Sequence, residues 1–308
     1  MGLLEVVVTN IVYAILWGIT LASASAGLNL LWGVMSVVNV AHGSILLLGS
    51  YLIVSLFLMG VSPYIGVIII AVFGVLFGLI TYWLLLHKTV GTVVTMTPAR
   101  VSSALLVMFG FGLLLDNMFY YIYGSEPKTL SNWYCAPINY ISFGFITLRV
   151  NTILGFAISI IIIVMLHVFL TRTMIGKALN AVMQNAEAIA LVGINPVKVK
   201  MVAAALSFAA TIVAGFSVIL YDVAVTPDTA NVYMSLIFVV CIIGGLGALK
   251  GSIVGGIVVG VLYNLLKVLW SYAISPTLSS SLAFMCVFAI YLVVLKAKPK
   301  GIFGWGIR

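Results

Sequence analysis

The chain has 308 residues, of which 64% are apolar and only 6% are charged. Because a soluble domain carries roughly 25% charged residues, this composition excludes a soluble protein and indicates an all-α polytopic membrane protein. At about 20 residues per spanning helix, we expect residues 1–308 to form a single transmembrane domain with roughly nine or ten crossings. The net charge of +8 does not indicate nucleic-acid binding, since Lys and Arg mark the cytoplasmic loops of membrane proteins.

The first apolar span runs from Glu5 to Gly27, and small residues in its second half let helices approach closely. The next stretch, residues 27–44, is interrupted by Asn29, Gly33, Ser36, Asn39 and His42. Polar main chain at membrane depth is tolerated only against protein or beside a water-filled cavity. The stretch therefore predicts a broken or re-entrant helix that lines a passage. The alternative is a buried helix whose polar side chains are all satisfied.

Eight further apolar spans follow, joined mostly by short loops. They cover residues 45–60, 65–86, 102–123, 151–171, 201–221, 232–249, 252–270 and 277–295. Of the 14 Lys and Arg residues, all but Lys128, Arg149 and Lys267 fall on one side of this topology, which the positive-inside rule assigns to the cytoplasm. If residues 29–42 cross fully, there are ten spans and a cytoplasmic N-terminus, the arrangement we favour. If they only dip into the membrane, there are nine spans and the N-terminus is outside.

The stretch Thr171–Lys200 is the only long segment that carries several charges and keeps helical amphipathicity. At about 100° per residue, its apolar and polar side chains fall on opposite faces, with Ile175, Leu179, Val182, Met183, Ala186 and Ala190 on one and Lys177, Asn180, Gln184 and Glu187 on the other. Cap signals divide it, with Thr173 starting one helix, Gly193 ending it, and Asn195-Pro196 starting the next. We therefore expect a cytoplasmic corner between two helices within residues 172–200.

No motif indicates catalysis or ATP hydrolysis by this chain. Gly176-Lys177 is followed by Ala178 and lacks the upstream glycine, so a phosphate-binding loop is not present. ATP hydrolysis, if used, therefore belongs to another chain. No carboxylate pair, nucleophile constellation or metal-ligand cluster indicates a membrane enzyme, and the three cysteines are too far apart in sequence to argue for a metal site or a disulfide.

Residues 244–260 are rich in glycine and superficially resemble a dinucleotide-binding loop. That loop needs a preceding strand, which an apolar membrane segment does not provide. The glycines Gly244, Gly245, Gly247, Gly251 and Gly255 instead predict a tight turn followed by close helix packing, since small residues spaced by four recur where membrane helices touch.

Three stretches together resemble one family, the permease subunits of ABC importers for branched-chain amino acids. They are GLNLLWGVMSVVNVAHG at residues 27–43, GKALNAVMQNAEAIALVGIN at residues 176–195, and IIGGLGALKGSIVGG at residues 242–256. The likeness covers most of the chain in order and spacing, and the length resembles the shorter (LivH-type) subunit. Glu187-Ala188-Ile189 followed by Gly193 is also similar to the EAA-x-x-x-G loop of importer permeases.

The resemblance implies an import machine in the inner membrane of a prokaryote. In such a machine a second, paralogous permease chain completes the pathway. Two ATPase chains, which hold the ATP and Mg, bind the cytoplasmic corners, and an extracytoplasmic binding protein delivers the substrate. Relatives carry urea, short amides or other amino acids as well as branched-chain amino acids.

Two groups of residues follow as candidate sites. We predict a substrate passage lined by Asn29, Ser36, Asn39, His42, Ser207 and Thr211. We predict ATPase coupling through Gly176, Lys177, Asn180, Gln184, Glu187 and Gly193. The alternative function is a stand-alone secondary carrier or channel for a small polar solute, in which Asp116 and His42 would couple or gate. For Asp116 we expect a pairing or snorkelling role instead of ion coupling.

Overall fold

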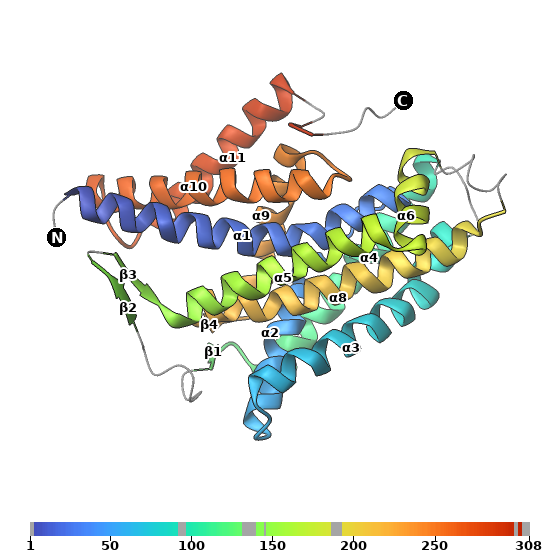
Figure 1. Ribbon diagram of the computed structural model, residues 1–308, viewed down its shortest axis with the longest axis horizontal. Coiled ribbons are helices and arrows are strands. Elements are labelled where there is room, and N and C mark those ends of the chain that lie inside the picture. The colour runs from blue at the N-terminus through green and yellow to red at the C-terminus, as the bar shows by residue number, and fades with distance from the viewer. Residues whose placement is uncertain are drawn as a thin grey trace.

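The computed structural model describes residues 3–91, 97–130, 140–144, 146–185, 193–298 and 301–303, and it is a bundle of helices (Figure 1). The helices are α1 (Leu3–Met35), α2 (His42–Leu58), α3 (Pro63–Thr81), the π-helix η1 (Tyr82–Gly91), α4 (Pro98–Tyr123), α5 (Val150–Arg172), α6 (Met174–Gln184), α8 (Pro196–Asp222), α9 (Thr229–Gly244), α10 (Leu249–Ala273) and α11 (Ser279–Ala297). The strands are β1 (Lys128–Thr129), β2 (Tyr140–Phe143), β3 (Ile146–Arg149) and β4 (Ala224–Val225).

Within these residues, 7 helical segments are long and apolar enough to cross a membrane. They are α1, α3 with η1, α4, α5, α8, α10 and α11. The apolar helices α2 and α9 are shorter, with 17 and 16 residues. The number of crossings, nine or ten, stays a prediction, but the all-helical membrane architecture is clear.

The first helix differs from the predicted span. α1 continues without a break to Met35 rather than ending at Gly27, so Asn29 and Gly33 lie in its last turns. Only residues 36–41 are non-helical before α2 begins. Residues 29–42 thus form no separate helix, which removes the basis for preferring ten spans. Figure 1 shows α1 starting near β2 and β3 and ending near α6, the opposite end of the bundle.

The core of the bundle is built around α1 and α8. In their apolar windows 67% and 78% of the residues are buried, against 22% in α4 and 11% in α11. Glycines make the central contacts possible: a Cβ at Gly49 of α2 would overlap the carbonyl of Ile212 in α8, and one at Gly215 would overlap that of Leu46. The outer faces of α3, α4, α5 and α11 are apolar and exposed, as lipid or another membrane chain requires.

The two ends of the bundle have different structures. At one end, β2 pairs antiparallel with β3, and β1 with β4. Here the hydroxyl of Tyr13 donates to Thr147 O (3.2 Å), and Arg149 Nη2 donates to Tyr221 O (3.1 Å). The opposite end carries α6, and there the Lys200 ammonium donates to Val90 O (2.9 Å). We call this second end the basic end.

Candidate functional site

The cytoplasmic corner begins with the short helix α6. Its predicted N-cap is confirmed, since Thr173 Oγ1 accepts from Gly176 N (2.9 Å) and donates to Phe169 O (2.7 Å). A Cβ at Gly176 would overlap the main chain of Phe169 and Leu170. The side chain of Asn180 donates from Nδ2 to Leu170 O (2.8 Å). Because main-chain contact and side-chain bonds act together, α6 is fixed rigidly to the end of α5.

The exposed face of α6 is partly different from the predicted one. Lys177 and Gln184 are exposed and Leu179 and Val182 are buried, as expected, but Ile175 is 49% exposed beside Met174, which is 82% exposed. Ile175 shares its helix face with the buried Leu179 but lies in the first turn of α6, beyond the part of the helix that packs inward. The first turn of α6 therefore presents apolar side chains together with the Lys177 charge.

The far side of the corner starts a new helix where predicted. α6 ends at Gln184 rather than continuing to Gly193, and Glu187 lies outside the described residues. Gly193 has φ +80°, the left-handed conformation that glycine adopts freely. Asn195 caps α8, with Oδ1 accepting from Val197 N at 2.9 Å. The predicted helix start at Asn195-Pro196 is therefore confirmed.

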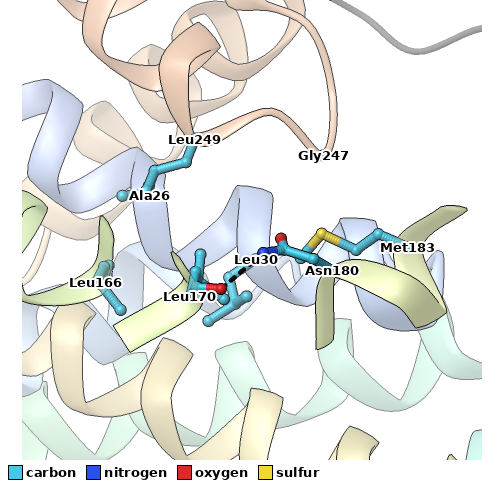
Figure 2. Close-up of a pocket in the computed structure, with 8 residues that line it drawn as sticks. All are labelled: Ala26, Leu30, Leu166, Leu170, Asn180, Met183, Gly247 and Leu249. Atoms are coloured by element: carbon cyan, nitrogen blue, oxygen red, sulfur yellow. Dashed lines mark hydrogen bonds between the residues drawn. The ribbon is translucent and has the colours of Figure 1, made fainter. Parts of the chain in front are cut away.

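A small cavity of about 50 Å³ lies between α1, α5, α6 and the α9–α10 turn. Figure 2 shows its lining: Ala26, Leu30, Leu166, Leu170, Asn180, Met183, Gly247 and Leu249. Met183 reaches across to α1, since a Cβ at Gly33 would lie 3.1 Å from its sulfur. The lining of the cavity is mostly apolar, so it is not a polar binding site.

The glycine-rich stretch forms a turn and a close helix contact. Gly245 and Gly247 have φ of +106° and +81° and form the turn between α9 and α10. A Cβ at Gly244 would overlap the carbonyl of Gly251, and one at Gly255 would overlap that of Val240. α9 and α10 therefore meet main chain to main chain. α1 meets α10 in the same way, since a Cβ at Gly18 would lie 2.7 Å from the Gly256 carbonyl oxygen.

Two of the predicted passage residues lie apart from the others. Asn29 is 1% exposed and is fully bonded: Nδ2 donates to Ser252 Oγ (2.7 Å) and Ala248 O (3.4 Å), and Oδ1 accepts from Gly247 N (3.1 Å). These bonds connect α1 to the α9–α10 turn and to the start of α10. For Asn29, the alternative of a buried polar side chain with all its hydrogen bonds made is therefore the one observed. Ser36 is exposed at the end of α1, with φ +54°.

Three other predicted passage residues come together where α1, α2 and α8 meet. His42 Nε2 lies 2.9 Å from Ala24 O and 3.0 Å from Thr211 Oγ1. Ser207 donates to Gly27 O at 2.7 Å. His42, Ser207 and Thr211 are each 0% exposed. We call these three residues with Asn39 the polar cluster.

Asn39 lies in the turn that leads into α2, where its carbonyl accepts from His42 N at 3.2 Å. It is 0% exposed. Neither Nδ2 nor Oδ1 of Asn39 has a hydrogen-bond partner among the described residues, and the same is true of His42 Nδ1. In the polar cluster, the hydrogen bonds of Ser207, Thr211 and His42 Nε2 fix its position. The side-chain amide of Asn39 and Nδ1 of His42 are buried there without a hydrogen-bond partner among the described residues.

Sequence reasoning missed the main-chain groups of the site. The carbonyls of Ala24 and Gly27 hold His42 and Ser207, and no pattern marks a carbonyl that a distant helix will use. Asp116 of α4 lies beside Ser44 in the first turn of α2, and its Oδ1 has no hydrogen-bond partner among the described residues, so its role stays a prediction. His167 is exposed near the end of α5.

The sequence is similar to known transport proteins. Residues 10–294 match the family model described as branched-chain amino acid transport system, permease component. The "Probable branched-chain amino acid transport permease protein LivH" of Methanocaldococcus jannaschii is 29% identical over 78% of this chain and 75% of that protein. The "High-affinity branched-chain amino acid transport system permease protein LivH" of Salmonella typhimurium is 23% identical over 93% of each.

A third relative is the high-affinity permease protein BraD of Pseudomonas aeruginosa, 22% identical over 93% of this chain and 92% of that protein. Among solved structures, a chain of PsaBC from Streptococcus pneumoniae in complex with Fab aligns over 96% of this chain and 92% of that chain, with 14% identity and a TM-score of 0.46. The family match covers most of the chain, so this protein belongs to the permease components of branched-chain amino acid ABC transport systems, as a multi-pass protein of the inner membrane in bacteria or archaea.

Proposed function

We propose that this chain is a permease subunit of an ABC importer and forms half of the translocation pathway for branched-chain or other hydrophobic amino acids. A second, paralogous permease subunit supplies the other half. Two ABC ATPase subunits provide ATP hydrolysis, with Mg, and an extracytoplasmic binding protein delivers the substrate. The relatives support this proposal because their names assign them to branched-chain amino acid transport.

The observation that carries the proposal is the rigid attachment of α6 to α5. A helix that receives force from a soluble motor must not slide on the membrane helix beneath it. At Gly176 the two main chains are in contact, and Asn180 bonds to Leu170. The exposed Met174, Ile175 and Lys177 offer an apolar and basic surface to a partner. A self-sufficient carrier has no need of such a docking element.

Contacts through α1 connect α6 to the polar cluster. Met183 of α6 contacts Gly33 near the end of α1, and the cavity beside it leaves room for displacement. α1 is unbroken from there to Ala24, whose carbonyl holds His42. A shift of α6 is therefore expected to reach the start of α2 through one rigid helix.

The second permease subunit is needed because the polar groups of this chain lie on few elements. The cluster joins α1, α2 and α8, whereas the outer faces of α3, α4, α5 and α11 are apolar. A second chain that packs against these apolar faces is proposed to complete the pathway. A heteromeric pair is proposed; a homodimer is the alternative.

Isolation of the tagged chain from its native membrane tests the proposal. We expect a second permease chain and ABC ATPase chains to co-purify. Reconstituted vesicles should take up radiolabelled leucine only with ATP on the ATPase side and loaded binding protein on the other. Uptake of leucine by the chain alone on a proton or sodium gradient would favour a secondary carrier. ATP-driven uptake of urea or acetamide, but not of leucine, would change the substrate class.

A further inference from the structure

The start of α2 holds buried polar atoms that the structure leaves unsatisfied. They are Nδ2 and Oδ1 of Asn39 and Nδ1 of His42. Both side chains are 0% exposed. A buried donor or acceptor without a partner destabilises the folded state, and an apolar residue would remove that cost. Their presence at one place therefore points to a ligand that they meet during transport.

This place lies within the membrane-spanning part of the bundle. His42 Nε2 contacts Ala24 and Thr211, which lie well inside the long helices α1 and α8. α2 has no side-chain cap at Ala41. The N–H of Gly43 points to the thioether sulfur of Met234 at 3.2 Å, and thioether sulfur is a weak acceptor. His42 N donates to Asn39 O (3.2 Å), so Gly43 is the first-turn residue whose N–H has a weak partner, at the end of α2 that carries partial positive charge.

The hydrogen bonds of His42 define which ring nitrogen is free. The Ala24 carbonyl can only accept, so Nε2 carries a proton and donates to it at 2.9 Å. Thr211 uses its own proton on Ser207 O (2.7 Å) and therefore accepts from the same Nε2. In the neutral imidazole Nδ1 is then an acceptor with a lone pair. Assigned in this way, the unsatisfied groups are two acceptors, Oδ1 and Nδ1, and one amide donor, Nδ2.

We propose that Asn39, Nδ1 of His42 and the first turn of α2 form a transient binding site for the zwitterionic end of an α-amino acid. The inference rests on the proposed function. The α-ammonium group donates to Asn39 Oδ1 and His42 Nδ1. The α-carboxylate accepts from Asn39 Nδ2 and lies at the start of the short apolar helix α2, since the partial positive charge at a helix N-terminus favours an anionic group. The side chain of the amino acid is left to the apolar surroundings.

The side chains of Asn39 and neutral His42 carry no fixed charge, which suits a passing substrate. The nearest acidic side chain is Asp116 of α4, which lies beside Ser44 in the first turn of α2. Neutral dipoles satisfy both charged ends without holding either one strongly, since hydrogen bonds to neutral groups are weaker than ion pairs in a buried setting. A weak site allows release into the cytoplasm.

Access to the site involves α4. A Cβ at Gly112 of α4 would lie 3.2 Å from Ala41 Cα, so α4 crosses directly over the start of α2. α4 is otherwise largely exposed, with only 22% of its apolar window buried. A displacement of this lightly packed helix would open the cluster toward the face that a second membrane chain can occupy.

The test uses the intact complex in nanodiscs and measures equilibrium binding of radiolabelled leucine by scintillation proximity. We expect leucine and norvaline to compete, whereas leucinamide, which lacks the carboxylate, and 4-methylpentanoate, which lacks the ammonium group, compete at least roughly tenfold less well, since each leaves buried groups unpaired. Asn39→Leu should reduce leucine binding and uptake by the same factor or more.

The melting temperatures of variants distinguish a binding role of Asn39 from a structural one. Asn39→Leu should leave the melting temperature unchanged or raise it, because it removes unpaired groups, whereas Asn29→Leu should lower it by breaking three bonds. If Asn39→Leu does not assemble, Asn39→Ala serves instead. Equal competition by leucinamide, no leucine binding, or full uptake by the Asn39 variants would overturn the site. If one of these results is found while the wild-type complex still takes up leucine with ATP, the binding site is wrong but the proposed function stands. If the wild-type complex takes up no leucine with ATP, the proposed function itself is wrong.

Discussion

Nε2 of His42, at the first residue of α2, lies 2.9 Å from the carbonyl oxygen of Ala24 inside α1. This contact fastens the start of a short helix to the middle of a long one. A carbonyl in the interior of a helix already accepts one intrahelical bond, and the imidazole uses its second lone pair. The start of α2 is therefore held at a fixed depth by a distant segment of the sequence.

Replacement of His42 tests that attachment. His42→Leu should lower the free energy of unfolding by about 1–3 kcal/mol, because Thr211 loses its donor partner and the Ala24 carbonyl loses its second bond. Thermal unfolding of the purified chain in detergent measures the effect. Thr171→Val removes a hydroxyl that bonds within its own helix near the exposed end of α5 and serves as the control. Equal stability of the two variants would contradict the attachment.

The close contact between α2 and α8 predicts that Gly49 cannot be enlarged. Gly49→Leu would place a side chain against the main chain of Ile212, so we expect little folded protein in the membrane. An added Cβ at Gly110 of α4 would meet no atom within 4 Å from the described residues beyond its own turn of helix, and Gly110→Leu should be produced at the wild-type level. Fluorescence-detected size-exclusion chromatography compares the two variants. A monodisperse peak for Gly49→Leu would show that the helices can separate at low cost.

The buried Lys200 connects α8 to η1 at the basic end of the bundle. Its ammonium group donates to Val90 O, and its side chain is 2% exposed. We expect this contact to stabilise the fold. Lys200→Met should cost about 1.5–3 kcal/mol of stability, the usual range for a hydrogen bond to a charged group. Lys198→Met, at an exposed position two residues earlier, should change stability by less than about 0.5 kcal/mol. Chemical denaturation of both variants measures the difference, and a larger loss for Lys198→Met would contradict it.

Parts of the fold follow from the sequence because local chemistry decides them. The caps at Thr173 and Asn195 and the left-handed Gly193 were predictable from residue type alone. The glycines of the α9–α10 stretch likewise predicted close packing. The apolar spans after the first were within about five residues of the observed helices for the same reason, whereas the first span continues to Met35.

Other parts depend on distant partners that a sequence does not display. Asn29 looked like a passage residue, but the turn at Gly247 and Ala248 satisfies it, more than 200 residues along the chain. That bonding lets α1 continue to Met35. Ile175 fitted the apolar face of an amphipathic helix, yet it is exposed in the first turn of α6, where Gly176 makes the contact with the end of α5. For Asn29 a long-range contact overrides the local pattern, and for Ile175 the corner between two consecutive helices does.

The α6 attachment predicts coupling between ATP hydrolysis and transport. Asn180→Leu removes the bond to Leu170, so α6 can shift without moving α5. ATP hydrolysis should then continue in the reconstituted complex while leucine uptake per ATP falls by roughly tenfold, about 1.4 kcal/mol of lost coupling free energy. Asn117→Leu is the control, because Asn117 is exposed and bonds only within its own helix.

Coupling of transport to ATP through α6 is tested most directly by the uptake of radiolabelled leucine into proteoliposomes that hold the complete complex. Uptake is measured with and without ATP, for the wild-type chain and for Gly176→Leu. We predict uptake that requires ATP and is lost in Gly176→Leu, where the added side chain forces α6 away from α5. Leucine uptake that proceeds without ATP, or that is unchanged in Gly176→Leu, would contradict an ATP-driven permease coupled through α6.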